Sequence, residues 1–297
     1  MKSKLKRREA LLGILFILPA LIFFSVFVLY PTFNTIGLSF VKWDMLSEKK
    51  FVLFDNYKHL FTDERLGKIA LNTLILTVLS VSLKLILGIL LAYFVFNIKN
   101  KVGKIIMETV IFLPIVLPMS VVSMVFLMLL NTDVGAINGI LQIFGISKIH
   151  WLDSQFLPLI SVLIIDIWKG IGFFFIISLV AMREIPYSYL EAADLDGASK
   201  MYKFRKIVLP CISSQTFFLV INALITTIQI FDPVYMVMSN GGPGDATTTM
   251  SYYIWKTGLQ ERNVGYGSTL AVILFGVIML VTLIQFLLSK YWVNYDK

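Results

Sequence analysis

Residues 191–210, EAADLDGASKMYKFRKIVLP, form a polar and partly basic insert between two long apolar segments. The insert predicts two short helices that meet at a turn. Pro186 suits the first turn of a helix, and Gly197 suits the residue just past its end. Ser199 is placed to cap the second helix, whose Lys and Arg residues lie toward its C-terminal half, where the dipole favours cations. We therefore expect a helical hairpin here.

The first helix of this hairpin has features of a docking element. Ala192 and Ala193 have small side chains, which leave room for the backbone of another protein. Glu191 offers a carboxylate to an arginine on such a partner. The alternative is an amphipathic surface hairpin that merely connects two membrane spans.

The hairpin resembles the coupling loop of bacterial ABC importer permeases, whose pattern is EAA…G…LP. The matching residues are Glu191, Ala192, Ala193, Gly197, Leu209 and Pro210. Asp196 and Ala198 around the central glycine resemble the carbohydrate-uptake branch of that family. Ser214 departs from the pattern, since many members carry a second proline there. The resemblance implies that Glu191, Ala192, Ala193, Asp196 and Gly197 couple the chain to an ATPase.

The composition is that of a membrane protein. The chain is 58% hydrophobic with a mean hydropathy of +0.83, whereas a soluble domain has about 45–50% apolar residues. Six segments are long and apolar enough to cross a bilayer as helices, at about 10–30, 70–96, 105–130, 156–182, 211–238 and 265–289. The predicted fold is an all-α, polytopic membrane protein with six transmembrane helices, similar to the type I ABC importer permease bundle. We expect one permease domain over 1–297, with core helices at 70–289, an extra N-terminal span at 10–30 and a coupling loop at 183–210.

The first apolar segment follows a basic start, as a secretory signal does. Its apolar run is too long for a signal peptide, and Tyr30-Pro31 stands where a cleavage site would be. We therefore interpret it as a retained helix that ends at this dipeptide.

Lys and Arg residues predict the orientation. One set of loops and both termini hold most of them: Lys2, Lys4, Lys6, Arg7, Arg8, Lys99, Lys101, Lys104, Arg183, Lys200, Lys203, Arg205, Lys206, Lys290 and Lys297. The opposite loops hold fewer: Lys42, Lys49, Lys50, Lys58, Arg65, Lys148, Lys256 and Arg262. Both termini and the hairpin are therefore predicted to be cytoplasmic. The net charge of +8 reflects an excess of Lys and Arg on one side of the membrane and does not indicate a nucleic-acid-binding domain.

Three more stretches strengthen the resemblance, which covers nearly the whole chain. LFILPALIFFSVFVLYPTF resembles the first helix of sugar permeases, and FDNYKHLFTD resembles the segment before their second span. SNGGPGDATTT, residues 239–249, resembles the Gly-Gly-Pro loop of the carbohydrate-uptake branch.

The sequence offers no catalytic constellation, metal site or cofactor motif. His59 and His150 are the two histidines, and both fall in loop segments. No glycine-rich phosphate-binding loop of the GxxxxGK[ST] type is present, so ATP would be hydrolysed by a partner. Cys211 is the single cysteine and is expected to be a buried, inert thiol. We therefore predict a transport subunit rather than an enzyme.

Polar residues within spans mark a candidate substrate path. On the fifth span, Asn222, Thr226, Gln229 and Asp232 recur at helical spacing. In the fourth span, Asp166 and Lys169 share a helical face and are placed to pair. The resemblance to maltose-type permeases implies that Trp168, Gly170 and Phe173 contribute to a sugar site, although Lys169 departs from that pattern.

Structural interpretations stay open for each of these residues. Asp166 and Lys169 also fit an interior ion pair, and Trp168 fits plain helix packing. Asn222 and Gln229 equally suit hydrogen bonds between helices, and Asp232 suits contact with a delivering protein or the Gly-Gly-Pro loop. Lys84, in the middle of the second span, is expected to pair across the bundle or a subunit interface.

The resemblance implies the permease subunit of an ATP-driven sugar importer in the bacterial plasma membrane. The partners that it implies are a second permease, two cytoplasmic ATP-binding subunits, an extracytoplasmic sugar-binding protein, an oligosaccharide or sugar derivative, and the lipid bilayer. Alternatives are an ion-coupled secondary transporter, an ABC permease for a non-sugar solute, and a structural or signalling subunit.

Overall fold

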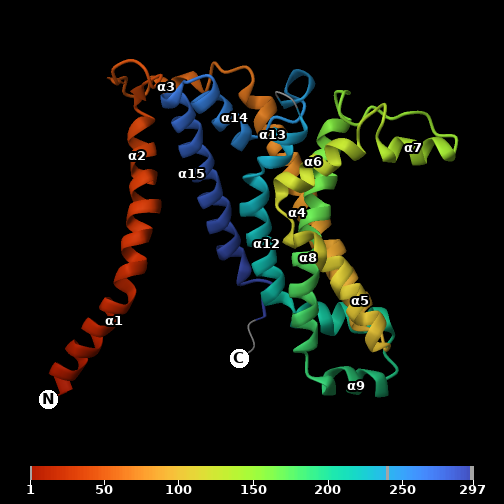
Figure 1. Cartoon of the computed structure of the whole chain (residues 1–297). Coiled ribbons are helices and arrows are strands. Elements are labelled where there is room, and N and C mark those ends of the chain that lie inside the picture. The colour runs from red at the N-terminus through yellow and green to blue at the C-terminus, as the bar shows by residue number, and fades with distance from the viewer. Residues whose placement is uncertain (1, 239–240, 295–297) are drawn as a thin grey trace. The chain divides into compact units, whose positions relative to one another are not determined.

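The computed structural model describes residues 2–238 and 241–294. Ser239 and Asn240, the first two residues of the predicted Gly-Gly-Pro loop, and Lys297 lie outside the described residues. Contacts divide the chain into two units, 1–63 with 254–275, and 64–253 with 276–297. Helices make up most of both units (Figure 1).

The first unit begins with a long apolar helix formed by α1 (Lys2–Phe24), the π-helical turn η1 (Ser25–Leu29) and α2 (Tyr30–Leu38). The predicted end at Tyr30-Pro31 is wrong, because Leu29 and Tyr30 keep helical backbone angles and the helix continues through Pro31. The Thr32 hydroxyl donates to the Val28 carbonyl over 2.7 Å. A π-helical turn and a threonine hydroxyl are known ways to accommodate a proline within a span. The span therefore runs on to Leu38.

The rest of the first unit fixes the start of α15 (Val264–Ser289) to the segment 39–63. That segment contains the antiparallel strands β1 (Val41–Lys42) and β2 (Lys50–Phe51) and the helix α3 (Asp55–His59). Thr269 on α15 donates to the Ser39 carbonyl over 3.1 Å, and the Tyr266 hydroxyl donates to Asp63 over 2.6 Å. The π-helical turn η6 (Lys256–Gln260) precedes α15.

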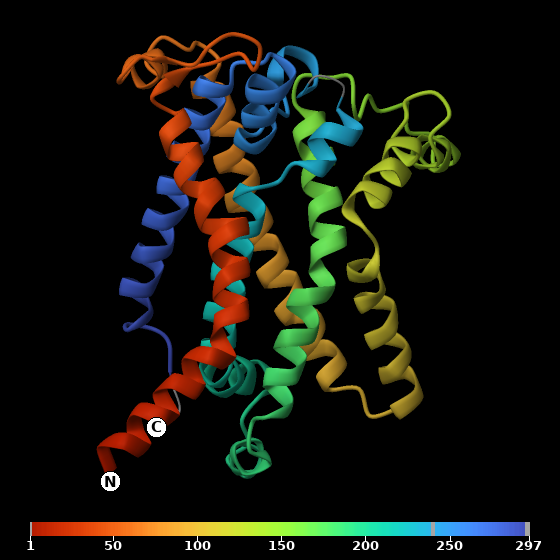
Figure 2. The ribbon, with the colours of Figure 1, turned by 60° about the vertical axis from the view of Figure 1, so that its left-hand side comes forward.

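The second unit is built around three long helices, α4 (Leu66–Phe96), α8 (Leu157–Arg183) and α12 (Ser213–Ile228). α4 and α8 run side by side, and α12 lies against α4 (Figures 1 and 2). One core cluster joins α4 and α8 to the hairpin and includes Phe175, Leu179 and Met182, each fully buried. A second cluster joins all three helices through Val81, Phe174, Leu219 and Ala223.

Glycine lets α4 and α8 approach closely. A Cβ built at Gly88 on α4 would lie 2.5 Å from the Phe174 Cβ on α8, which no real contact allows. Small residues at such contacts are typical of membrane helices, since lipid provides no hydrophobic drive for their association. The contact also sets the spacing between α4 and α8.

The third predicted span, 105–130, is not one straight helix. It consists of α5 (Lys101–Phe112), the 3₁₀ turn η2 (Leu113–Val116) and α6 (Met119–Leu129), with a bend of 100° between the two halves. Leu117 has extended backbone (φ −75°, ψ 138°), because Pro118 disfavours helical geometry in the residue before it. The proline thus breaks the span and leaves carbonyls of η2 without helical partners.

The fifth predicted span, 211–238, is also interrupted. α12 ends at Ile228, and a short helix α13 (Asp232–Val237) follows after three residues. Pro233 stands in the first turn of α13, where its missing N–H is harmless. The predicted polar stripe is therefore not one continuous helical face, since Gln229 follows the end of α12 and Asp232 begins α13.

With the bent pair taken as one span, the described residues contain six membrane-spanning candidates, as predicted. The connecting helices are α7 (Ala136–Ile143), α9 (Tyr187–Leu195), α10 (Lys200–Lys203), η3 (Phe204–Val208), α11 (Leu209–Cys211), η5 (Pro243–Asp245) and α14 (Met250–Trp255).

The described part of the Gly-Gly-Pro loop is fastened to the start of α4. Arg65 forms two hydrogen bonds of 2.8 Å with the Asp245 carboxylate. The Asn72 amide donates to the backbone carbonyls of Asp245 and Thr248. Asp245 has a φ of +61°, so this network holds a backbone conformation that L-residues rarely adopt.

Candidate functional site

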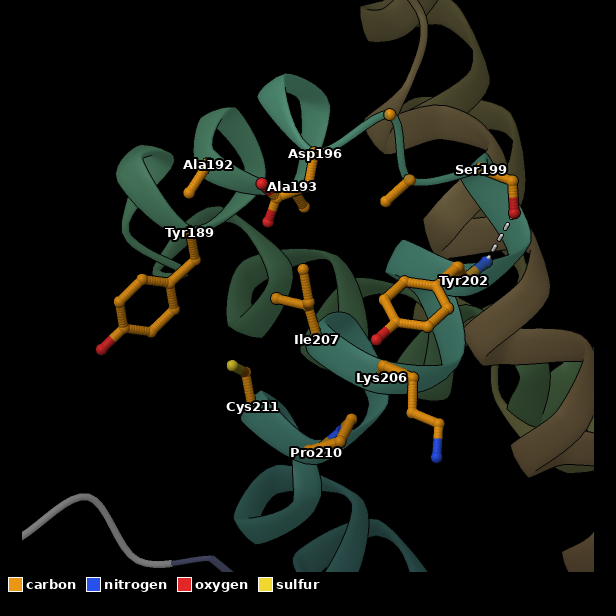
Figure 3. A pocket seen from close by; sticks show the side chains of 12 residues that line it. Tyr189, Ala192, Ala193, Asp196, Ser199, Tyr202, Lys206, Ile207, Pro210 and Cys211 are labelled. Carbon is orange, nitrogen blue, oxygen red and sulfur yellow. Dashed lines mark hydrogen bonds between the residues drawn. The ribbon is translucent and has the colours of Figure 1, made fainter.

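The hairpin has the local structure that its sequence predicts. α9 ends at Leu195, and Gly197 has a φ of +71°. The N–H groups of Gly197 and Ala198 donate to the carbonyls of Asp194 and Ala193, which is the Schellman arrangement that satisfies a helix C-terminus. The Ser199 hydroxyl accepts from the Tyr202 N–H over 3.2 Å and caps α10 (Figure 3). Both expectations for the turn are confirmed.

A hollow of about 900 Å³ lies between the two arms of the hairpin. Ala192, Ala193, Asp196 and Gly197 of the predicted coupling residues line it, together with Tyr189, Ala198, Ser199, Tyr202, Lys206, Ile207, Pro210 and Cys211 (Figure 3). The predicted burial of Cys211 is only partial, since its side chain is half-buried. The hollow is wide enough for a side chain or short segment of another protein.

The first arm of the hairpin also carries exposed apolar side chains. Leu195 is 86% exposed and Tyr187 is 76% exposed, whereas Leu190 of the same helix packs against the core cluster. Glu191 is exposed as well and makes no hydrogen bond or ion pair with any described residue. Exposed apolar residues around a concavity typically mark a protein interaction site.

The hairpin is firmly connected to the spanning helices. On α4, the Tyr93 hydroxyl donates to the Lys200 carbonyl over 3.0 Å, and its ring lies 4.6 Å from that of Phe204. α9 follows directly on α8, and Lys203 forms an ion pair with Asp194 across the two arms. A force applied to the hairpin would therefore reach both α4 and α8.

The candidate substrate-path residues meet at a second cavity, of about 400 Å³, within the spanning part of the second unit. Five of the six predicted residues line it, namely Gly170, Phe173, Asn222, Gln229 and Asp232. Trp168 does not line it. Its ring packs against Phe126 on α6 with a centroid distance of 5.5 Å, and 41% of its surface is exposed.

The predicted ion pair between Asp166 and Lys169 is wrong. Asp166 pairs instead with Lys84 on α4, at 2.6 Å, and also accepts a hydrogen bond from Ser80. Gly170 makes this possible, because a Cβ there would lie 2.7 Å from the Lys84 Cε. The expectation that Lys84 pairs across the bundle is confirmed.

Lys169 donates to the Ile115 carbonyl over 2.9 Å. That carbonyl belongs to η2, where the break before Pro118 leaves acceptors free. Sequence reasoning missed this contact, and it did not place Lys84 or Lys169 in the cavity. The position of Lys84 could have been inferred, since Lys84 and Asp166 are opposite charges in the middle of two spans. The position of Lys169 depends on the bend before Pro118, which apolar composition alone does not reveal.

No group of three or more His, Cys, Asp or Glu side chains is arranged to hold a metal ion within residues 2–238 and 241–294. The lining of the cavity combines amides, aromatic rings and charged groups with aliphatic side chains. Such a lining suits reversible binding of a polar solute.

Residues 84–292 match the family model described as "Binding-protein-dependent transport system inner membrane component". The chain belongs to this family. It is therefore a multi-pass membrane permease, and its similar proteins are transport subunits rather than enzymes.

Two curated relatives and one solved structure are similar to the permease over most of their length. The sulfoquinovosyl glycerol transport system permease SmoG of Agrobacterium fabrum is 32% identical, over 92% of this chain and 89% of the relative. The trehalose/maltose transport system permease MalF of Thermococcus litoralis is 30% identical, over 97% of both chains. A chain of a bacterial ABC transporter that imports the acidic polysaccharide alginate superposes with a TM-score of 0.84 at 25% identity, over 97% of both chains.

Proposed function

We propose that this permease forms half of the translocation pore of an ATP-driven sugar importer. A second permease forms the other half, two ATP-binding subunits dock on the hairpins, and a sugar-binding protein delivers the solute to the opposite face. The observation that carries the proposal is the exposed hairpin, with its alanines and Gly197 lining a hollow next to unpartnered apolar residues.

Sugar is the solute class that the cavity and the relatives support. Aromatic rings such as Phe173 pack on the C–H faces of sugars, and the amides of Asn222 and Gln229 pair with hydroxyls. The relatives carry names of sugar and sugar-derivative transport systems. An ion-coupled transporter is less well supported, because it would have no use for a docking hairpin.

The mechanism follows from the connections of the hairpin. ATP binding closes the two ATPases, and the hairpins move with them. Tyr93 passes this movement to α4, and the direct link from α8 to α9 passes it to α8. Because both helices line the cavity, the cavity opens to the other side of the membrane, and hydrolysis resets it.

Glu191 and its neighbours transmit force in this mechanism and carry out no chemistry. The exposed Glu191 carboxylate is free to pair with an arginine of the ATPase, and Ala192 and Ala193 allow close approach. The hairpin is then cytoplasmic, in agreement with the Lys and Arg distribution of the loops.

Gly197 provides the test of coupling. A Cβ at Gly197 meets nothing within 4 Å in this chain, so a substitution acts through the backbone or through a partner. Valine at this φ of +71° costs about 1–2 kcal/mol, whereas asparagine tolerates such a conformation. We expect Gly197→Val to keep ATP hydrolysis and lose uptake in proteoliposomes, and Gly197→Asn to retain most uptake.

Copurification of all subunits is the control that both variants assemble. Full sugar uptake by an assembled Gly197→Val transporter would contradict the coupling role of the hairpin. A loss of both ATP hydrolysis and uptake in both variants would indicate that the substitutions weaken docking of the ATPase rather than alter the conformation of the turn.

A further inference from the structure

Four charged side chains line the intramembrane cavity: Lys84, Asp166, Lys169 and Asp232. The first two neutralise each other over 2.6 Å, and both side chains are nearly buried. They are therefore occupied within the chain. The two remaining charges come from different elements, one from α8 and one from the start of α13.

Lys169 makes no ion pair with a described residue, because the Asp166 carboxylate, three residues earlier on α8, pairs with Lys84. Its ammonium donates to one neutral acceptor, the Ile115 carbonyl, at 2.9 Å. An ammonium has three N–H donors, so two remain for another acceptor in the cavity. A cation within a membrane span is costly unless it pairs or faces a polar space, and it then commonly marks a binding site.

The remaining polar groups of the lining carry no positive charge that could pair with an acid group. Asn222 and Gln229 contribute neutral amides that both donate and accept. Asp232 carries a negative charge and has no hydrogen-bond or ion-pair partner among the described residues, so it accepts from hydroxyls and repels an acid group. An acid group on a ligand is thus directed to Lys169 and the hydroxyls to the remaining groups.

We propose that the cavity selects anionic saccharides, of the uronate-containing class, and that Lys169 is the specificity-determining residue that pairs with the ligand carboxylate. This inference rests on the proposed sugar-import function. A carboxylate that enters the membrane loses its hydration and needs a cation in return. A neutral sugar would leave the Lys169 ammonium without an anion and would gain no binding free energy from its charge.

Equilibrium binding to the assembled permease–ATPase complex in detergent tests the inference without the binding protein. The probes are trigalacturonate and trimannuronate, each compared with the neutral trisaccharide made by reducing its carboxyl groups. The members of each pair share their linkage and size and differ in the acid groups. We expect at least one uronate to bind about tenfold or more tightly than its reduced counterpart, the minimum typical of a desolvated charge pair.

Variants at the same position assign the preference to the side chain. Lys169→Gln is expected to remove the preference for the uronate, and Lys169→Arg to keep most of it. Lys99→Gln is the matched control, since Lys99 is exposed, lines no cavity described above and makes no ion pair with a described residue. The wild-type comparison does not depend on whether Lys169→Gln assembles.

In the binding experiment, the inference would be overturned by equal binding of uronate and reduced sugar, by binding of neither uronate, or by a preference that survives in Lys169→Gln. ATP-dependent uptake of neutral oligosaccharides at equal rates by wild type and Lys169→Gln would also overturn it, while leaving the importer function intact. Absence of ATP-dependent uptake of every saccharide, neutral or acidic, would count against the importer function itself.

Discussion

At the residue scale, the second unit depends on a charge pair buried between two spanning helices. The exposed fractions of the Lys84 and Asp166 side chains are 5% and 13%. Ser80 donates to the same carboxylate, and Thr227 on α12 lies 3.4 Å from the Lys84 ammonium. Each charge is tolerated within the membrane because its attraction to the other offsets the cost of desolvation.

Removing one member of this pair should destabilise the permease strongly. Asp166→Asn leaves the Lys84 ammonium buried without an anion, and we expect the free energy of unfolding to fall by about 3–5 kcal/mol. Unfolding by sodium dodecyl sulfate in mixed micelles, followed by circular dichroism, measures the change.

The double variant Lys84→Met with Asp166→Leu is the control for this prediction. It removes both charges and keeps apolar volume, so it should lose clearly less stability than the single variant. Equal losses in the two would mean that the charge pair is not what stabilises this contact.

At the element scale, breaks and close contacts of helices create the cavity. The 100° bend at Leu117-Pro118 gives Lys169 its carbonyl partner, and the break after Ile228 places Gln229 and Asp232 in the lining. Gly88 holds α4 and α8 at close range. The cavity is thus a consequence of how the helices are interrupted and spaced.

Gly88→Ala should therefore separate α4 from α8. The added Cβ would lie 2.5 Å from that of Phe174, and overpacking of this kind costs about 1–3 kcal/mol. The same unfolding measurement gives the loss.

Gly67→Ala, in the same helix, is its matched control. A Cβ there meets nothing within 4 Å, so we expect its stability to stay within about 1 kcal/mol of wild type. A Gly88→Ala variant as stable as Gly67→Ala would show that the helices adjust without cost.

At the scale of the whole molecule, the charge of the loops predicts which end of the permease faces the cytoplasm. Two residues at opposite ends of spans offer a matched comparison. Leu195 in the hairpin and Val134 in the loop before α7 are each 86% exposed. The rule for Lys and Arg places the first inside and the second outside.

Single-cysteine labelling tests this orientation. In a Cys211→Ser background without ATPase subunits, Val134→Cys should react with a membrane-impermeant maleimide in intact cells, and Leu195→Cys should react only after permeabilisation. The reverse pattern would place the hairpin outside and would remove the basis for coupling to an ATPase.

The sequence by itself determined the class of the protein, the number of spans and the hairpin. Each depends on local information: apolar length decides what crosses a bilayer, and Gly197 and Ser199 decide where the two short helices end and begin. Asn222, Gln229 and Asp232 line one cavity because polar groups in spans avoid lipid, and the family resemblance indicated Gly170 and Phe173 in the same lining.

Only the tertiary structure decided which groups meet. Spacing along one helix suggests that Asp166 faces Lys169, yet the carboxylate pairs with Lys84, because Gly170 opens a path for a side chain from α4. The packing of Trp168 on Phe126 likewise depends on a neighbour distant in sequence. Periodicity defines the faces of a helix, but long-range packing selects the helix that each face meets.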